Sequence, residues 1–125
     1  MARGLFLNLE KLDGGIRRKL SDGVEAQVFF GDAVMVSRVV CQPGAKGKLH
    51  AHPEEQWGVL LQGSGIRVQD GERFAVRQGD LWQTPSNVEH TFEAGPEGAV
   101  ILDIFSPPRE EYRVAGEGFG KGVKG

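Results

Sequence analysis

The chain has 125 residues, 19 of them glycine, and its 15 lysines and arginines nearly balance 17 aspartates and glutamates, giving a net charge of −2. This balance provides no basic surface for nucleic acid or for an anionic membrane, and no apolar run approaches the roughly 20 residues that span a bilayer. We therefore expect no nucleic-acid and no membrane partner. The apolar stretch near the N-terminus is too short for a secretory signal, so we expect a cytoplasmic protein.

Glycine and proline interrupt the chain so often that the longest stretch without either, residues 32–42, barely has the length of an average helix. The alternation of apolar and polar residues predicts strands instead, at 24–30, 33–41, 56–62, 65–69, 72–76, 80–85, 90–94 and 99–106. The segments between them have the composition of turns, and Gly63–Gly65 is typical of a hairpin turn. Many short strands at this spacing predict an all-β sandwich or closed barrel.

One domain is expected over residues 1–115, because the chain is long enough for one hydrophobic core and no linker or repeat divides it. Residues 116–125 are mostly glycine and lysine with one aromatic, which predicts a flexible tail. The single cysteine, Cys41, excludes an internal disulfide and is typical of a small buried residue in a strand.

All three histidines fall into one candidate metal site. His50 and His52 are two residues apart, so in an extended segment both imidazoles project to the same face. Two imidazoles in this relation can occupy adjacent positions around one metal ion. Gln56 can bring a side-chain carbonyl oxygen as a further ligand, and His90 completes the set from a later strand.

The candidate ligands carry no charge, which has a chemical consequence. Three neutral imidazoles and an amide leave a divalent ion with both of its positive charges, so the site favours a small anionic ligand such as a sugar acid. Nitrogen and oxygen ligands in this set suit nickel, zinc, iron, manganese or cobalt alike. Glu54 and Glu55 remain alternatives to Gln56, because Pro53 interrupts the strand register beside them.

The strand at 99–106 places a charge among aliphatic residues. Ile101, Asp103 and Phe105 share one of its faces, and Val100, Leu102 and Ile104 share the other. If the first face lines a barrel, the carboxyl group points into the cavity, where burial raises its pKa into a range useful for proton transfer. The other face is then an outward apolar stripe, which predicts a homodimer. The alternative is an aspartate at a solvent-exposed edge.

Arg109 follows two prolines that end this strand. A guanidinium group binds carboxylates through two parallel hydrogen bonds, so Arg109 is a candidate for holding an acidic substrate at the cavity mouth. A solvated surface arginine is the alternative. Three further side chains, Arg38, Trp57 and Trp82, could line the cavity or lie elsewhere, and the alternation of residues does not decide between these positions.

The spacing of these residues resembles the two conserved motifs of the cupins. Residues 44–63 contain Gly, five residues, His-x-His, three residues, a ligand position, six residues and Gly, and residues 79–90 resemble the second motif. The resemblance implies a double-stranded β-helix, or jelly-roll barrel, with the metal inside its mouth. Three positions depart from the pattern: Gln56 stands where most cupins have glutamate, Asn87 replaces a glycine and Ala94 replaces an asparagine.

Gln56 together with the ending D-x-F-S-P-P-R-E is similar to the pectin-degradation cupins of KdgF type. This resemblance implies an isomerase that opens the ring of 4,5-unsaturated uronates to give linear keto-uronates. In that function Asp103 would move the proton, Phe105 would shape the pocket and Arg109 would bind the substrate carboxylate. Two other functions stay open, another metal-dependent cupin enzyme such as a dioxygenase, and a non-catalytic ligand-binding cupin.

Overall fold

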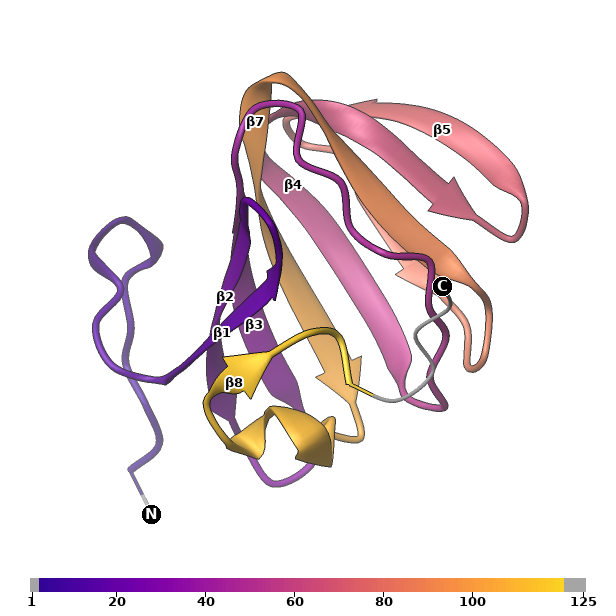
Figure 1. Cartoon of the computed structure of the whole chain (residues 1–125). Helices are drawn as coiled ribbons and strands as arrows, with labels where there is room; N and C mark the ends of the chain where they lie inside the picture. The colour runs from indigo at the N-terminus through magenta and orange to yellow at the C-terminus, as the bar shows by residue number, and fades with distance from the viewer. Residues whose placement is uncertain (1–2, 121–125) are drawn as a thin grey trace.

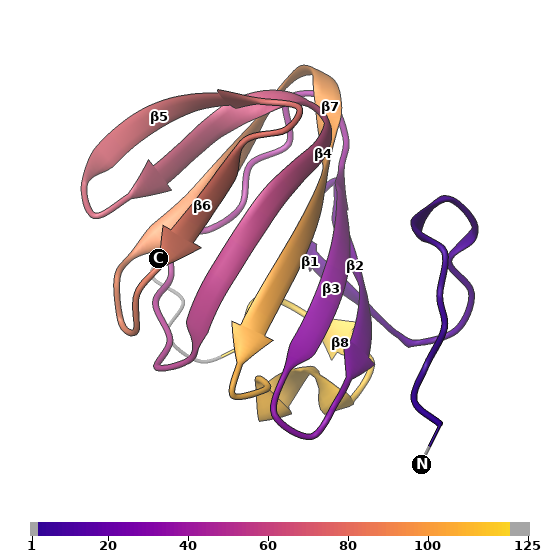
Figure 2. The ribbon, with the colours of Figure 1, turned by 180° about the vertical axis from the view of Figure 1, so that it is seen from behind.

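A computed structural model describes residues 3–120 of the chain. The strands form one curved sheet in the order β5-β4-β7-β3-β2-β1-β8, with β6 paired to β4 outside this path (Figures 1 and 2). Their bounds are β1 Ile16–Ser21, β2 Val24–Phe30, β3 Met35–Cys41, β4 Glu55–Gln69, β5 Glu72–Arg77, β6 Leu81–Thr84, β7 His90–Ser106 and β8 Gly116–Glu117. Two short 3-10 helices, η1 (Leu9–Lys11) and η2 (Glu110–Arg113), are the helical segments of the described chain. The predicted all-β jelly-roll barrel is confirmed.

The long strands β4 and β7 pair antiparallel with each other along nearly their whole length. The first half of β4 pairs with the second half of β7, and beyond residue 65 the second half of β4 pairs with the start of β7. The register shifts between Leu60 and Gln62 and again between Gly63 and Gly65, where both strands bend together (Figure 1). Each long strand therefore contributes to both walls of the barrel.

These bends correct the prediction of a hairpin turn at Gly63–Gly65. The chain does not reverse there; β4 continues through the segment with a bulge. Gly63 has φ +84°, and a Cβ on it would collide with the backbone of Gly98, itself at φ +77°. Glycine is thus required because two bent strands cross closely, and a composition typical of turns cannot distinguish a bend from a reversal.

Strand β1 was absent from the sequence-based prediction. Its sequence, "IRRKLS", carries three successive cations that hide the apolar alternation. In the structure it pairs antiparallel with β2, and Arg18 points inward with Leu20 while Arg17 and Lys19 face solvent. The inward arginine is tolerated because its guanidinium donates hydrogen bonds to backbone carbonyl groups of the C-terminal segment.

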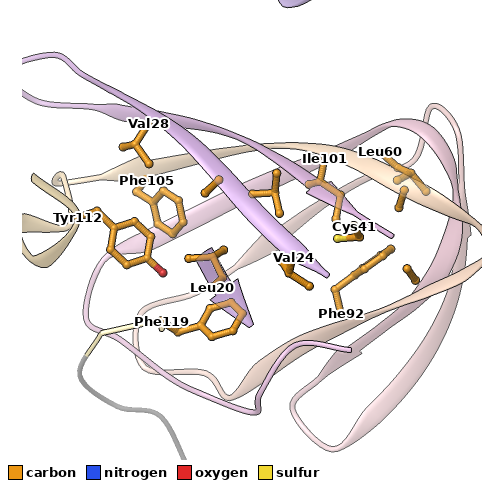
Figure 3. Packing of buried hydrophobic residues seen from close by; sticks show 14 of the residues in the cluster. Leu20, Val24, Val28, Cys41, Leu60, Phe92, Ile101, Phe105, Tyr112 and Phe119 are labelled. Carbon is orange, nitrogen blue, oxygen red and sulfur yellow. The ribbon is translucent and has the colours of Figure 1, made fainter. Parts of the chain in front are cut away.

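The barrel interior is a continuous apolar cluster drawn from both walls (Figure 3). The labelled side chains include Leu60 at one end and Phe105, Tyr112 and Phe119 at the other. Cys41 is buried in this cluster, as its sequence context predicted. No helix within residues 3–120 has the length and apolar character needed to cross a membrane.

The segment after η2 differs from the flexible tail expected over residues 116–125. Gly116–Glu117 form β8, which pairs in parallel with Arg18 and Lys19 of β1 (Figure 1). Phe119 then turns into the barrel and is buried. The rest of the expected tail, residues 121–125, lies outside the described residues.

Candidate metal centre and proton-transfer site

Backbone pairing brings the three histidines together. His50 and His90 form an antiparallel bridge, with each backbone N–H donating to the other's carbonyl oxygen at 3.1 and 2.9 Å. His52 follows on the same face, and its carbonyl oxygen accepts from the backbone N–H of Asn87, which adopts φ +65° in the turn before β7. Asn at this position supplies the left-handed geometry that the replaced glycine would have supplied.

Each imidazole is oriented through its Nδ1 atom. The Nδ1 atoms of His50, His52 and His90 lie 2.7, 3.0 and 2.8 Å from the backbone carbonyl oxygens of Lys48, Glu54 and Val88. A carbonyl oxygen only accepts, so Nδ1 carries the proton in all three rings and Nε2 keeps its lone pair. This tautomer is the one that a metal ion needs.

The three rings are closely grouped and remain neutral. Their candidate ligand atoms all lie within 4.8 Å of one another, and the buried Nε2 atom of His90 has no hydrogen-bond partner among the described residues. Burial lowers the pKa of His50 and His52 to about 4 and that of His90 to about 2. An orphaned buried lone pair among neutral imidazoles fits a metal ion.

Gln56 completes the group from the start of β4. Its side-chain Oε1 lies 3.0 Å from Nε2 of His52, and its Nε2 donates to Oδ1 of Asp103 at 3.0 Å. Because Nδ1 of His52 carries the proton, two lone pairs face each other across the first contact. A metal ion held by both atoms would remove this repulsion. A shared cation accounts for this contact, so Gln56 also fits the metal.

The alternative ligands Glu54 and Glu55 lie elsewhere. The carboxylate of Glu54 lies 3.5 Å from Nδ1 of His52, on the side of the ring away from Nε2. That of Glu55 is on the surface, where it accepts from the indole of Trp57 and the amide of Gln83. The geometry therefore favours Gln56 as the fourth ligand.

Asp103 faces the cavity from β7, between Ser37 of β3 and Gly58 of β4. Burial raises the pKa of its carboxyl group to about 6, although the cation of Arg67 and the hydrogen bond from Gln56 oppose the rise. From β4, the side chain of Gln56 reaches the carboxyl group and donates to its Oδ1. A carboxyl group that titrates near neutrality can both take up and release a proton.

Phe105 and Arg109 lie at the end of β7. The Phe105 ring is buried 5.6 Å from the His52 ring. Arg109 is fully buried rather than exposed at the mouth, and it donates to the hydroxyl of Tyr112 and to the carbonyl of Phe119. Its Nε has no hydrogen-bond partner within the described chain and lies 3.8 Å from the Glu54 carboxylate. Of the sequence-predicted site residues, six line one cavity: His50, Gln56, His90, Asp103, Phe105 and Arg109. His52 lies beside them, in contact with Gln56.

The geometry agrees with a comparison against known families. Residues 37–105 match the Cupin_2 family, described as the cupin domain, a segment that includes the triad, Gln56 and Asp103. The chain belongs to the cupin family.

Two curated relatives and one solved structure are similar to this chain over most of its length. The pectin degradation protein KdgF of Dickeya dadantii is 31% identical over 104 residues, which cover 82% of this chain and 88% of that protein. A 3-hydroxyanthranilate 3,4-dioxygenase of Ruegeria pomeroyi is 28% identical over 115 residues, 89% of this chain but 63% of that protein. The structure of KdgF from Halomonas sp. has a TM-score of 0.76 at 24% identity, covering 86% of this chain and 97% of its own. That structure supports the fold.

Two residues that line the cavity of this cupin were not predicted from the sequence. Phe119 packs its ring against that of His50 at 4.5 Å between centroids, although its glycine-rich surroundings suggested a tail. Arg67 lines the same cavity from β4, inward with Gly65 and Gln69 in the alternating pattern. In the sequence, the position of this charged residue between Ile66 and Val68 was the feature that could have indicated its role.

The three side chains that the sequence left undecided lie away from the cavity. Arg38 is on the outward face of β3, opposite Leu102 of β7. Trp57 is 41% exposed on the outer face of β4. Trp82 packs its indole across Gly58, where a Cβ would collide with it, and stacks on Phe92 at 6.1 Å.

Proposed function

We propose that this cupin is a metal-dependent isomerase that opens 4,5-unsaturated uronates to linear keto-uronates. The relative named as a pectin degradation protein supports this assignment, since it covers most of both chains. The single observation that carries the chemistry is the position of Asp103. Its carboxyl group lies 3.0 Å from the amide of Gln56, which in turn contacts His52, and its pKa is raised to about 6.

The reaction requires only movements of protons and of one C–O bond. The C1 hydroxyl loses its proton, the bond between C1 and the ring oxygen breaks, and C1 becomes an aldehyde. The ring oxygen is then an enolate oxygen on C5, and protonation of C4 converts this enolate into a ketone. No atom is gained or lost, so one group that accepts and returns a proton is sufficient, and we assign this task to Asp103.

Phe105 and Arg109 hold the substrate in this proposal. The Arg109 Nε, which has no hydrogen-bond partner among residues 3–120, can donate to a substrate carboxylate. Phe105 supplies an apolar wall beside His52 that orients the sugar ring and limits water. A metal ion held by His50, His52, Gln56 and His90 would stabilise the negative charge that develops on the ring oxygen.

Proton NMR of unsaturated galacturonate with the metal-loaded protein tests the proposal. We expect ring opening faster than the spontaneous reaction, and an Asp103→Asn variant should lose about 100-fold or more in rate with unchanged metal content. Asp22→Asn, an exposed carboxylate on the loop after β1, is the matched control and should behave as wild type. No acceleration by the wild-type protein would refute the assignment, and a uronate bound but returned unchanged would indicate a ligand-binding cupin.

A second candidate is an oxygen-dependent reaction. The observation that favours it is the 28% identity to a 3-hydroxyanthranilate 3,4-dioxygenase over 89% of this chain. An oxygen electrode distinguishes the two functions, because ring opening of a uronate consumes no oxidant. Oxygen uptake by the iron-loaded protein with 3-hydroxyanthranilate would favour the dioxygenase.

We also propose that the protein acts as a homodimer in the cytoplasm on a small anionic substrate. The support for the dimer is the partly exposed apolar stripe Val100, Leu102 and Ile104 on the outer face of β7. The support for the substrate class is the uncharged ligand set around the metal position and the two arginines that line the cavity.

A further inference from the structure

Arg67 is a buried cation that no carboxylate of the described residues contacts. Only 5% of the residue is exposed, and no carboxylate of residues 3–120 lies within 4.0 Å of its guanidinium. Its hydrogen-bond acceptors are neutral, with Nε donating to Gln69 Oε1 at 3.2 Å and Nη2 to Thr84 Oγ1 at 2.8 Å. Burying an unpaired charge costs several kcal/mol, so a purely structural role would favour an uncharged residue here.

The guanidinium of Arg67 is held rigidly against the wall of the cavity. It lies 5.5 Å over the centroid of the Trp82 ring, and Gln69 in turn accepts from the hydroxyl of Thr84. The position of Trp82 is itself fixed by Gly58, which leaves room for the indole. A cation whose direction is set by stacking and two hydrogen bonds is preorganised for a ligand.

The register of β4 and β7 places Arg67 next to the histidine group. Gln69 pairs with His90, and Arg67 pairs with Phe92 two residues further along β7, so Arg67 is the diagonal neighbour of His90 on the inward face. Both line one cavity of about 50 Å³ together with Gln56 and Asp103. Arg67 also lowers the pKa of His90 and opposes the rise in the pKa of Asp103, which agrees with this proximity.

The two cavity arginines differ in how their charges are balanced. Arg109 has the carboxylates of Glu54 and Glu111 at 3.8 Å, and it also donates to Tyr112 and Phe119. Arg67 has hydrogen-bond acceptors but no contacting carboxylate among residues 3–120, and burial lowers its pKa only to about 10, so it stays charged at neutral pH. Of the two cavity arginines, Arg67 is therefore the one free to take a carboxylate from a ligand.

We infer that Arg67 is a second anion-binding residue of this site and that it recognises the carboxylate of a sugar acid inside the cavity. Both arginines line the same small cavity of about 50 Å³, so a carboxylate that enters it meets Arg67 as well as Arg109. Arg67 then contributes to specificity, since a neutral sugar leaves its charge without a partner. This inference rests on the proposed function for its substrate class.

Calorimetric titration of the zinc-loaded protein with galacturonate, and with galactose as the neutral probe, tests the inference. We expect galacturonate to bind and galactose not to bind. Arg67→Gln should weaken galacturonate binding about 10- to 100-fold, as expected for the loss of a charge-assisted hydrogen bond, whereas Arg67→Lys should retain part of it. Arg73→Gln, an exposed arginine on β5 paired with Glu93, is the matched control and should bind as wild type.

A second measurement uses the wild-type chain, so it does not depend on whether the variants fold. The side-chain N–H signals of Arg67, assigned by their loss in Arg67→Lys, should shift on addition of galacturonate and saturate at the calorimetric affinity. Unshifted signals, unchanged binding by folded Arg67→Gln, or no binding by wild type would overturn the inference. Arg67-dependent binding without any ring opening would support Arg67 as the anion site and reject only the isomerase.

Discussion

At the scale of single residues, Gln56 links the candidate metal ligands to Asp103, the proposed proton-transfer group. Its amide oxygen faces His52 and its amide nitrogen donates to Asp103, so one planar group contacts both parts of the site. An amide can satisfy both neighbours because it has an acceptor at one end and a donor at the other. The glutamate typical of the cupin motif offers only acceptors when ionised, and it would place a second negative charge beside Asp103.

Gln56→Glu should therefore strengthen metal binding and disturb the proton transfer. The new carboxylate neutralises one charge of the ion, so the metal should dissociate less readily in competition with a chelator. A like charge about 3 Å away raises the pKa of Asp103 above its value of about 6. The rising limb of the pH–rate profile should move upward by about one unit or more.

Gln62→Glu is the control for this substitution, because Gln62 is exposed on β4 and far from Asp103 in the register. It should leave both the metal affinity and the pH profile unchanged. An unmoved profile in Gln56→Glu with normal metal content would show that the contact between Gln56 and Asp103 does not control the proton-transfer group.

The histidine group predicts how the stability of the chelator-treated protein depends on pH. Burial lowers the pKa of His50 and His52 to about 4 and of His90 to about 2. Below pH 6.5 these histidines therefore bind protons in the unfolded chain but stay neutral in the folded chain. Asp103 acts in the opposite direction between pH 6 and 3.8, because its raised pKa lets the folded state hold one proton more. Three histidines outweigh one aspartate, so stability falls as the pH falls.

Urea unfolding between pH 6.5 and 4.5 should record this loss, which we expect to be about 4 kcal/mol. His52→Gln removes one titrating group and should reduce the slope by about a half, because Asp103 already offsets part of the histidine contribution. A free energy of unfolding that stays constant over this interval would contradict the neutral, buried state of the triad.

At the scale of elements, the C-terminal segment is attached to the barrel by one arginine. The Arg18 guanidinium donates to the backbone carbonyls of Glu111, Val114, Glu117 and Gly118 at 2.7 to 3.2 Å. It also lies 4.7 Å over the Tyr112 ring. β8 and the buried ring of Phe119 thus depend on a side chain that is about one hundred residues away in the sequence.

Arg18→Ala should release this segment. We expect a loss of about 2–4 kcal/mol in the free energy of unfolding, from hydrogen bonds to a charged donor that no other group replaces. Amide hydrogen exchange should accelerate at Gly116–Glu117, because these residues pair only with β1 in the described structure. Arg17→Ala, the outward neighbour on the same strand, should change neither quantity. Equal exchange rates in both variants would contradict the role of Arg18.

The C-terminal segment also shows what local sequence cannot reveal. Phe119 lies between glycines, a context typical of a flexible end, and its burial follows from contacts with His50 and Arg109 that only the folded chain creates. β1 was missed for a similar reason, since the partners that make an inward Arg18 tolerable come from the far end of the chain. In both cases, contacts between residues far apart in the sequence determined the local structure, and the local composition did not indicate it.

At the scale of the whole molecule, the sequence was sufficient for the barrel and for the residues bordering the metal position. Fixed spacings carried that information, because His50 and His52 share a face in any extended segment and Asp103 alternates with buried neighbours. Spacing could not indicate the charge balance of the cavity. Whether Arg67 or Arg109 has a counter-ion depends on the positions of Glu54 and Glu111 in space.

The outer surface of the barrel has a largely apolar face whose side chains are partly exposed. The stripe of Val100, Leu102 and Ile104 on β7 continues sideways, with Val36 of β3 beside Ile104 and Val59 of β4 beside Leu102. The outer face of an antiparallel sheet is normally polar, so an apolar face across three strands indicates a buried surface. A second copy fits it, because a two-fold axis would bring the same face of each copy together.

We therefore expect the wild-type protein to have the mass of a dimer in size-exclusion chromatography with light scattering. Leu102→Glu should give a monomer with an unchanged circular dichroism spectrum, because the side chain points outward and a charge there opposes burial against the second copy. Arg77→Glu also changes charge, but on the exposed strand β5 outside this face, and should stay dimeric. A wild-type monomer, or a Leu102→Glu dimer as stable as wild type, would contradict this interface.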